Sequence, residues 1–89
     1  MREREVEIVI KAGLDAPASA KLARVAATYR CEVSLMRHGR KVNAKSLMGV
    51  MMLVAGEGSR IVIETDGPDE VEALDAIAML IGSRVVGTE

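Results

Sequence analysis

Hydrophobic positions along this chain follow two periods, one typical of strands and the other typical of helices. Apolar and polar residues alternate in four short segments, and we expect strands at 5–11, 31–36, 41–43 and 60–65. Apolar residues recur every three or four positions in three other segments, as on one face of a helix. We expect these helices at 18–29, from 46 to about 54, and from a start within 66–70 to near 82.

Turn residues separate these segments. Gly13 ends the first strand, and residues 37–40 form the expected turn of a hairpin between the second and third strands. The order β-α-β-β-α-β-α fits one α+β domain, 1–89, and a chain of 89 residues has no room for a second. Several split-βαβ modules share this order, so the order alone does not assign a function.

Aromatic residues are nearly absent, since the chain has one tyrosine and neither phenylalanine nor tryptophan. We therefore expect a core of aliphatic residues and methionine, and no stacking platform for single-stranded nucleic acid. The 12 basic and 13 acidic residues leave a net charge of −1, too little to hold DNA or an anionic membrane.

The chain contains no apolar run of membrane-spanning length, and residues 1–5 lack the apolar core of a signal sequence. The single cysteine, Cys31, cannot form a disulfide within the chain and has no metal-ligating partners at a typical spacing. We expect a cytoplasmic protein without a membrane segment, a metal or a cofactor, and we expect Cys31 to lie in the core.

Two helix starts carry candidate chemistry. Asp15 precedes the first helix and Ser46 precedes the second, and both residue types favour the N-cap position. The segment after Ser46 is more apolar than one buried face requires, and exposed methionines often mark a partner surface.

Within that segment we expect Val50 and Leu53 to pack in the core. We expect Met48, together with Met51 or Met52, to stay exposed for docking. The alternative is that these methionines only fill a core that lacks aromatic side chains.

The run 42–53 (VNAKSLMGVMML) resembles the regulatory serine segment of the HPr family, small carriers of the bacterial sugar phosphotransferase system that are phosphorylated on a histidine. Weaker matches lie at Ala26, Tyr29, Gly39 and 72–74, and together they cover essentially the whole chain. The resemblance implies an open-faced β-sandwich, in which a four-stranded antiparallel sheet carries three helices on one face.

The resemblance also implies phosphoryl relay. Enzyme I phosphorylates the histidine at the start of the first helix, and IIA domains receive the group. The family site reads Gly-Leu/Ile-His-Ala-Arg-Pro, whereas this chain reads GLDAPA at 13–18. An ungapped alignment puts Asp15 at the histidine position and Pro17 at the arginine position. The chain therefore lacks the family's phosphate acceptor and the arginine that contacts the phosphate.

Asp15 has three interpretations. It is an ordinary N-cap, a fixed carboxylate that mimics a phosphorylated histidine, or an acceptor that forms an acyl phosphate. Such an acceptor usually needs a divalent cation held by further carboxylates, and no acidic residue lies near Asp15 in the sequence. His38, the one histidine, lies in the expected turn and is not expected to carry phosphate.

For Ser46, the resemblance implies phosphorylation by HPr kinase/phosphorylase with ATP, as in the regulated members of the family. The added charge would lie at the first turn of a helix, where negative charge is favoured. The alternative is that Ser46 only caps the helix.

The resemblance further implies a docking face made by the second helix and the start of the first. The candidate partner-binding residues are Leu14, Pro17, Arg24, Leu47, Met48, Met51 and Met52.

The sequence thus predicts an HPr-like protein that is not an enzyme and acts as a regulatory or docking module controlled at Ser46. In lacking the histidine it is similar to catabolite-repression HPr. The implied partners are HPr kinase/phosphorylase and a transcriptional regulator or metabolic enzyme, with Enzyme I or IIA domains as further ones. The alternative is a divergent phosphocarrier that accepts phosphate from Enzyme I on Asp15. A third option is a small interaction domain with neither phosphorylation.

Overall fold

The strands and helices follow one another along the chain in nearly the expected order. The computed structural model describes residues 1–81 with their side chains and the backbone of 84–88. The elements are β1 (Arg2–Glu7), α1 (Ala16–Ala27), β2 (Glu32–Arg37), β3 (Arg40–Asn43), α2 (Leu47–Met51), β4 (Arg60–Asp66), α3 (Glu70–Ile81) and β5 (Arg84–Thr88).

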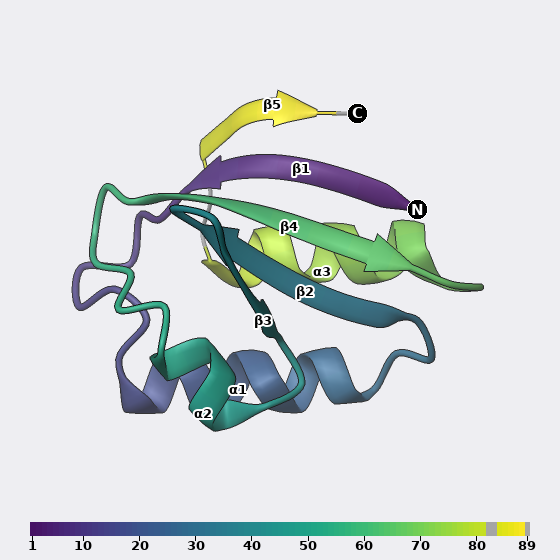
Figure 1. The fold of residues 1–89 in the computed structure, drawn as a ribbon, viewed down its shortest axis with the longest axis horizontal. Coiled ribbons are helices and arrows are strands. Elements are labelled where there is room, and N and C mark those ends of the chain that lie inside the picture. Colours follow the sequence, from purple (N-terminus) through teal and green to yellow (C-terminus); the bar gives the residue numbers. More distant parts are fainter. Residues whose placement is uncertain (82–83, 89) are drawn as a thin grey trace.

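All paired strands are antiparallel, in the order β3-β2-β4-β1-β5. The four predicted strands form the open sheet, and the three helices cover one of its faces (Figure 1), so the predicted α+β sandwich is confirmed. The chain adds a fifth strand that its hydrophobic pattern did not indicate. β5 lies beside β1, at the edge of the sheet opposite β3.

Alternation along the strands separates a buried face from an open face. Val6, Leu35 and Ile63 are fully buried, and the register that pairs Leu35 with Ile63 aligns them on the helical side. The largest fully buried side chains are Ile8, Leu22, Leu35, Ile61, Ile63, Ile77 and Ile81. The expectation of an aliphatic core is confirmed, and Cys31 lies in it, but methionine was wrongly expected there, since none of the methionines in residues 1–81 is buried.

Several predicted boundaries were wrong, and backbone bonds to residues distant in sequence set the end of the first strand. β1 ends at Glu7, and Ile8 then bonds to the loop before β4 instead, through the carbonyl of Ser59 and the N–H of Gly58. α2 ends at Met51, three residues before the expected end near Val54. The first helix begins at Ala16 rather than Ala18, directly after its cap.

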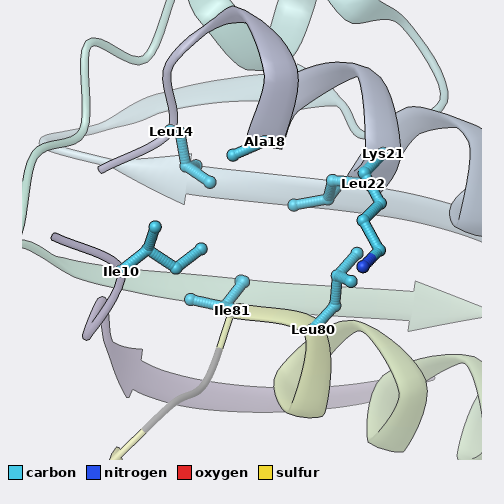
Figure 2. Close-up of a pocket in the computed structure, with 7 residues that line it drawn as sticks. All are labelled: Ile10, Leu14, Ala18, Lys21, Leu22, Leu80 and Ile81. Carbon is cyan, nitrogen blue, oxygen red and sulfur yellow. The ribbon is translucent and has the colours of Figure 1, made fainter. Parts of the chain in front are cut away.

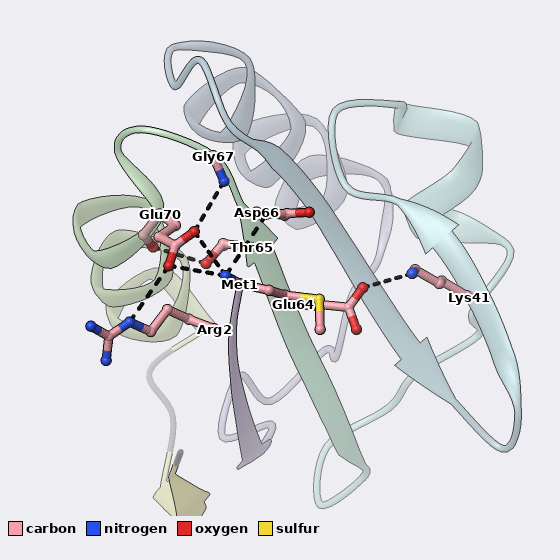
Figure 3. Close-up of polar contacts among 8 residues, drawn as sticks. All are labelled: Met1, Arg2, Lys41, Glu64, Thr65, Asp66, Gly67 and Glu70. Carbon is pink, nitrogen blue, oxygen red and sulfur yellow. Dashed lines mark hydrogen bonds and ion pairs between the residues drawn. The ribbon is translucent and has the colours of Figure 1, made fainter.

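Carboxylates fix the start of α3 (Figure 3). One Glu70 oxygen accepts a hydrogen bond from the N–H of Gly67 at 3.1 Å, and the same carboxylate pairs with the amino group of Met1 and with Arg2. The Gly67 N–H is the main reason that the pKa of Glu70 lies below its ordinary value. On the open face of the sheet, Lys41 and Glu64 form an ion pair at 2.6 Å.

Candidate functional site

The start of α1 is built around Asp15. Its backbone is extended, and its Oδ1 accepts a hydrogen bond from the N–H of Ala18 at 3.0 Å. Its carbonyl accepts from the N–H of Ser19, and Pro17 lies in the first turn, where a missing N–H is tolerated. The N-cap interpretation of Asp15 is therefore confirmed.

Gly13 brings the Asp15 loop against the chain that follows α2. Its φ is +68°, and a Cβ at this position would lie 2.6 Å from the carbonyl oxygen of Ala55 and 2.6 Å from the Cα of Gly56. Next to it, the N–H of Leu14 donates to the Ala55 carbonyl at 2.8 Å. The approach is close enough that only glycine fits at position 13.

Ser46 caps α2 in the same way. Its backbone is extended, its side chain is partly buried, and its Oγ accepts a hydrogen bond from the N–H of Gly49 at 3.1 Å. Gly49 leaves the space that this geometry needs. A Cβ there would lie 3.0 Å from the Asn43 carbonyl oxygen and 3.5 Å from the Ser46 hydroxyl.

The apolar segment after Ser46 divides as predicted. Val50 is fully buried and Leu53 is 4% exposed, whereas Met48 is 71% exposed and Met52 is 54% exposed. Leu47, Met51 and Val54 are exposed as well. The exposed members, Leu47, Met48, Met51, Met52 and Val54, are called the methionine face below.

Arginines of the β2–β3 hairpin hold the end of α2. Arg37 donates to the carbonyl of Leu53 at 3.1 Å, and Arg40 donates to the carbonyl of Met52 at 3.2 Å. These bonds complete carbonyls that the end of a helix leaves without partners. Sequence reasoning missed this role, although two arginines in one short turn were a signal that could have been followed.

α1 lies beside α2 (Figure 1), and the loop before α1 lies against the chain that follows α2, where the N–H of Leu14 bonds to the carbonyl of Ala55. A hollow of about 240 Å³ separates the Asp15 loop from the end of the methionine face. It is lined by Ala12, Leu14, Asp15, Met51, Val54, Ala55 and Gly56. The structure thus brings Asp15 together with Met51, which are far apart in sequence.

The remaining candidates on α1 differ in exposure. Pro17 and Arg24 are exposed, and both are available at the surface. Leu14 is 6% exposed and packs in the core, so it offers little surface to a partner. The reason is its N–H bond to Ala55, which draws position 14 inward.

A second hollow, of about 190 Å³, lies between α1 and the last turn of α3 (Figure 2). Its lining is Ile10, Leu14, Ala18, Lys21, Leu22, Leu80 and Ile81. Neither Asp15 nor Ser46 lines it, so it is separate from the candidate site.

Within residues 1–81 and 84–88, the structure groups no three histidine, cysteine, aspartate or glutamate residues as metal ligands. Over the same residues, no helix has the length and apolar character needed to cross a membrane.

Residues 2–83 match the family model described as the PTS HPr component phosphorylation site. The chain belongs to the HPr family. It is 54% identical over 84 residues to the phosphocarrier protein HPr of Cupriavidus necator, covering 94% of each chain. It is 42% identical over 81 residues to the HPr-like protein Crh of Halalkalibacterium halodurans, covering 91% of this chain and 96% of Crh.

The fold agrees with this family membership. A crystal structure of HPr from Bacillus anthracis superposes with a TM-score of 0.86 at 38% identity, covering 88% of this chain and 93% of the other. This chain is thus an HPr-like protein of the phosphotransferase system, a family of phosphocarriers rather than catalysts. Its own sequence has Asp15 at the start of α1, and its one histidine, His38, is exposed in the β2–β3 turn.

Proposed function

We propose that this HPr-family protein is a regulatory docking module controlled by phosphorylation of Ser46, and not a histidine phosphocarrier. The observation that carries the proposal is the pairing of two features on one short helix. A serine hydroxyl caps α2, and the residues directly after it form an exposed apolar surface. A change of charge at Ser46 would therefore act next to the surface that a partner contacts.

The chemistry at Ser46 would be transfer of the γ-phosphoryl group of ATP. The serine oxygen forms a bond to phosphorus, the bond to the β-phosphate oxygen breaks, ADP leaves, and a base of the kinase takes the hydroxyl proton. The phosphate would then lie at the N-terminus of α2, where backbone N–H groups and the helix dipole favour negative charge. In the free protein the Gly49 N–H already points at the Ser46 oxygen.

The residue type at the start of α1 argues against a histidine relay in this chain. The relay needs a nitrogen nucleophile at the start of α1, and the residue there is an aspartate that already serves as the cap. His38 lies on the hairpin, on a different element. We propose that Asp15 supplies a fixed negative charge to the docking face.

The partners proposed are HPr kinase/phosphorylase, together with a transcriptional regulator or metabolic enzyme that recognises the methionine face. Residues 1–89 would act as one domain in the cytoplasm, without cofactor. Pro17 and Arg24, exposed on α1, would border the same face. Methionine side chains suit such a surface because they adapt to partners of different shape.

The alternative function is a divergent phosphocarrier that accepts phosphate on Asp15 from Enzyme I. Its support is the exposure of the Asp15 carboxylate beside an open hollow and the name phosphocarrier on the Cupriavidus necator relative. Here an Asp15 carboxylate oxygen would attack the phosphorus of phosphorylated Enzyme I, the bond from that phosphorus to Enzyme I would break, and Enzyme I would leave without its phosphate. The acyl phosphate formed on Asp15 is of the kind that hydroxylamine cleaves. Enzyme I and IIA domains would then be the partners.

Intact-mass measurement of the purified protein separates these functions. One reaction contains ATP and HPr kinase/phosphorylase, and the other contains phosphoenolpyruvate and Enzyme I. We expect one phosphate in the ATP reaction alone, lost in Ser46→Ala and retained in Asp15→Asn. A hydroxylamine-labile phosphate from phosphoenolpyruvate, lost in Asp15→Asn, would establish the carrier instead. The absence of phosphate in both reactions would support the third option, a small interaction domain that is phosphorylated on neither residue.

A further inference from the structure

Val54 has a backbone conformation that valine rarely adopts. Its φ is +51°, in the left-handed region, where a branched Cβ crowds the backbone. Val54 lies two residues beyond Met52, the C-cap of α2, and a left-handed residue near the end of a helix is most often glycine. Among the described residues, His38 is the other non-glycine residue with a positive φ.

Packing of the Val54 side chain does not offset this backbone strain. The Val54 side chain is 78% exposed, and the bond from its N–H to the Met51 carbonyl is one that any residue except proline can make. The next residue, Ala55, is buried and accepts the Leu14 hydrogen bond, so the turn itself is fixed. Folding therefore accounts for the turn but not for the valine. Strained residues of this kind concentrate at functional sites.

The position of Val54 supplies a role. Val54 and Met51 line the 240 Å³ hollow from one side, and Asp15 lines it from the other. Asp15 is the one charged residue among the seven that line this hollow. An occupant that places an apolar group against Val54 and a positive charge beside Asp15 would match both features.

We propose that Val54 is a specificity-determining contact residue of the docking face. The proposed occupant of the hollow is an apolar side chain of a protein partner, with an arginine or lysine of that partner beside Asp15. The inference rests on the proposed docking function and names the chemistry of its partner. A glycine at position 54 would give a more stable protein with a poorer docking face.

The test compares stability and binding in the same variants. Val54→Gly removes both the strain and the contact, and Val54→Ala removes the contact while keeping a non-glycine residue at positive φ. His38→Gly is the control for strain outside the hollow, and Met79→Ala is the control for loss of an exposed apolar side chain on α3. Melting temperature and calorimetric affinity for purified HPr kinase/phosphorylase and purified Enzyme I are the readouts.

We expect Val54→Gly to melt about 4 °C higher and to bind at least one of the two proteins about tenfold more weakly. Val54→Ala should bind as weakly without the full thermal gain. His38→Gly and Met79→Ala should bind like the unmodified protein. Asp15→Asn, which keeps a capping side chain, should weaken binding and reduce its dependence on salt.

Three outcomes would overturn the inference: unchanged affinity in Val54→Gly, a lower melting temperature in that variant, or no binding of the unmodified protein to either probe. Unchanged affinity in Asp15→Asn would contradict the proposed arginine or lysine of the partner beside Asp15. The Ser46 proposal is tested separately: it fails if the mass measurement shows no ATP-dependent phosphate. The expected effects of the Val54 variants on binding to Enzyme I do not depend on that result.

Discussion

The backbone N–H of Leu14 donates a hydrogen bond of 2.8 Å to the carbonyl oxygen of Ala55. This bond joins the loop before α1 to the loop after α2. It places Asp15 on one side of the hollow and Val54 on the other. The candidate site therefore depends on the contact between these loops as much as on the side chains at its surface.

Gly13→Ala should disrupt that contact. A methyl group would lie 2.6 Å from the Ala55 oxygen, and φ at this position is +68°, so the loops must separate. We expect a loss of about 3 kcal/mol in the free energy of unfolding, measured by denaturant titration. Gly39→Ala is the matched control, because φ there is +77° but nothing lies within 4 Å of the added carbon. That variant should lose only about 1 kcal/mol, and an equal loss in both would contradict the steric explanation.

Ser46 should contribute to stability as a cap whether or not it is phosphorylated. Ser46→Ala removes the oxygen that accepts from Gly49 and should lower the free energy of unfolding by about 1 kcal/mol. Ser46→Asn retains a capping oxygen, so it should unfold like the unmodified protein while failing to accept phosphate from ATP. Thermal melts and intact mass measure the two effects. A large loss of stability in Ser46→Asn would show that the hydroxyl has a further structural role.

Arg37 should position the methionine face without contacting a partner. Its bond to the Leu53 carbonyl spans the hairpin and the end of α2, and Arg37→Met should lower the free energy of unfolding by about 1–2 kcal/mol. Hydrogen exchange should rise at the amides of 50–53. The more exposed bond from Arg40 predicts a smaller effect in Arg40→Met. Identical exchange in Arg37→Met and in the unmodified protein would show that this bond does not hold the helix end.

Stability should fall at acid pH because of Asp69. Its carboxylate accepts hydrogen bonds from the N–H groups of Arg30 and Cys31, at 2.8 and 2.9 Å. The Arg30 bond is the main reason that the pKa of Asp69 lies below its ordinary value of 3.8. A carboxyl with a lowered folded-state pKa stabilises the fold above its unfolded pKa, and that contribution is lost as pH falls through the folded value.

The free energy of unfolding should therefore decline as pH drops below about 4. Asp69→Asn should be less stable at neutral pH and should show a shallower decline, since it has no carboxyl to protonate at this position. Glu57→Gln, on an exposed loop residue, is the control and should follow the unmodified protein. Parallel curves for Asp69→Asn and the unmodified protein would assign the acid sensitivity to other groups.

The sequence alone determined the order of the elements from β1 to α3, the aliphatic core and the two helix caps. These are local properties: hydrophobic period sets the buried face of an element, and a serine or aspartate before a helix satisfies the first N–H groups. Val50 and Leu53 were placed in the core for the same reason, and both are buried there.

Tertiary structure decided where those elements end and what lies beside them. Leu14 is buried because Ala55, 41 residues later in the chain (55 − 14), accepts its N–H. Arg37 caps α2 because the hairpin folds across it, and Val54 turns outward because the helix has already ended at Met51. The burial of Leu14 and the bond from Arg37 depend on partners distant in sequence, and hydrophobic periodicity carries no information about such partners.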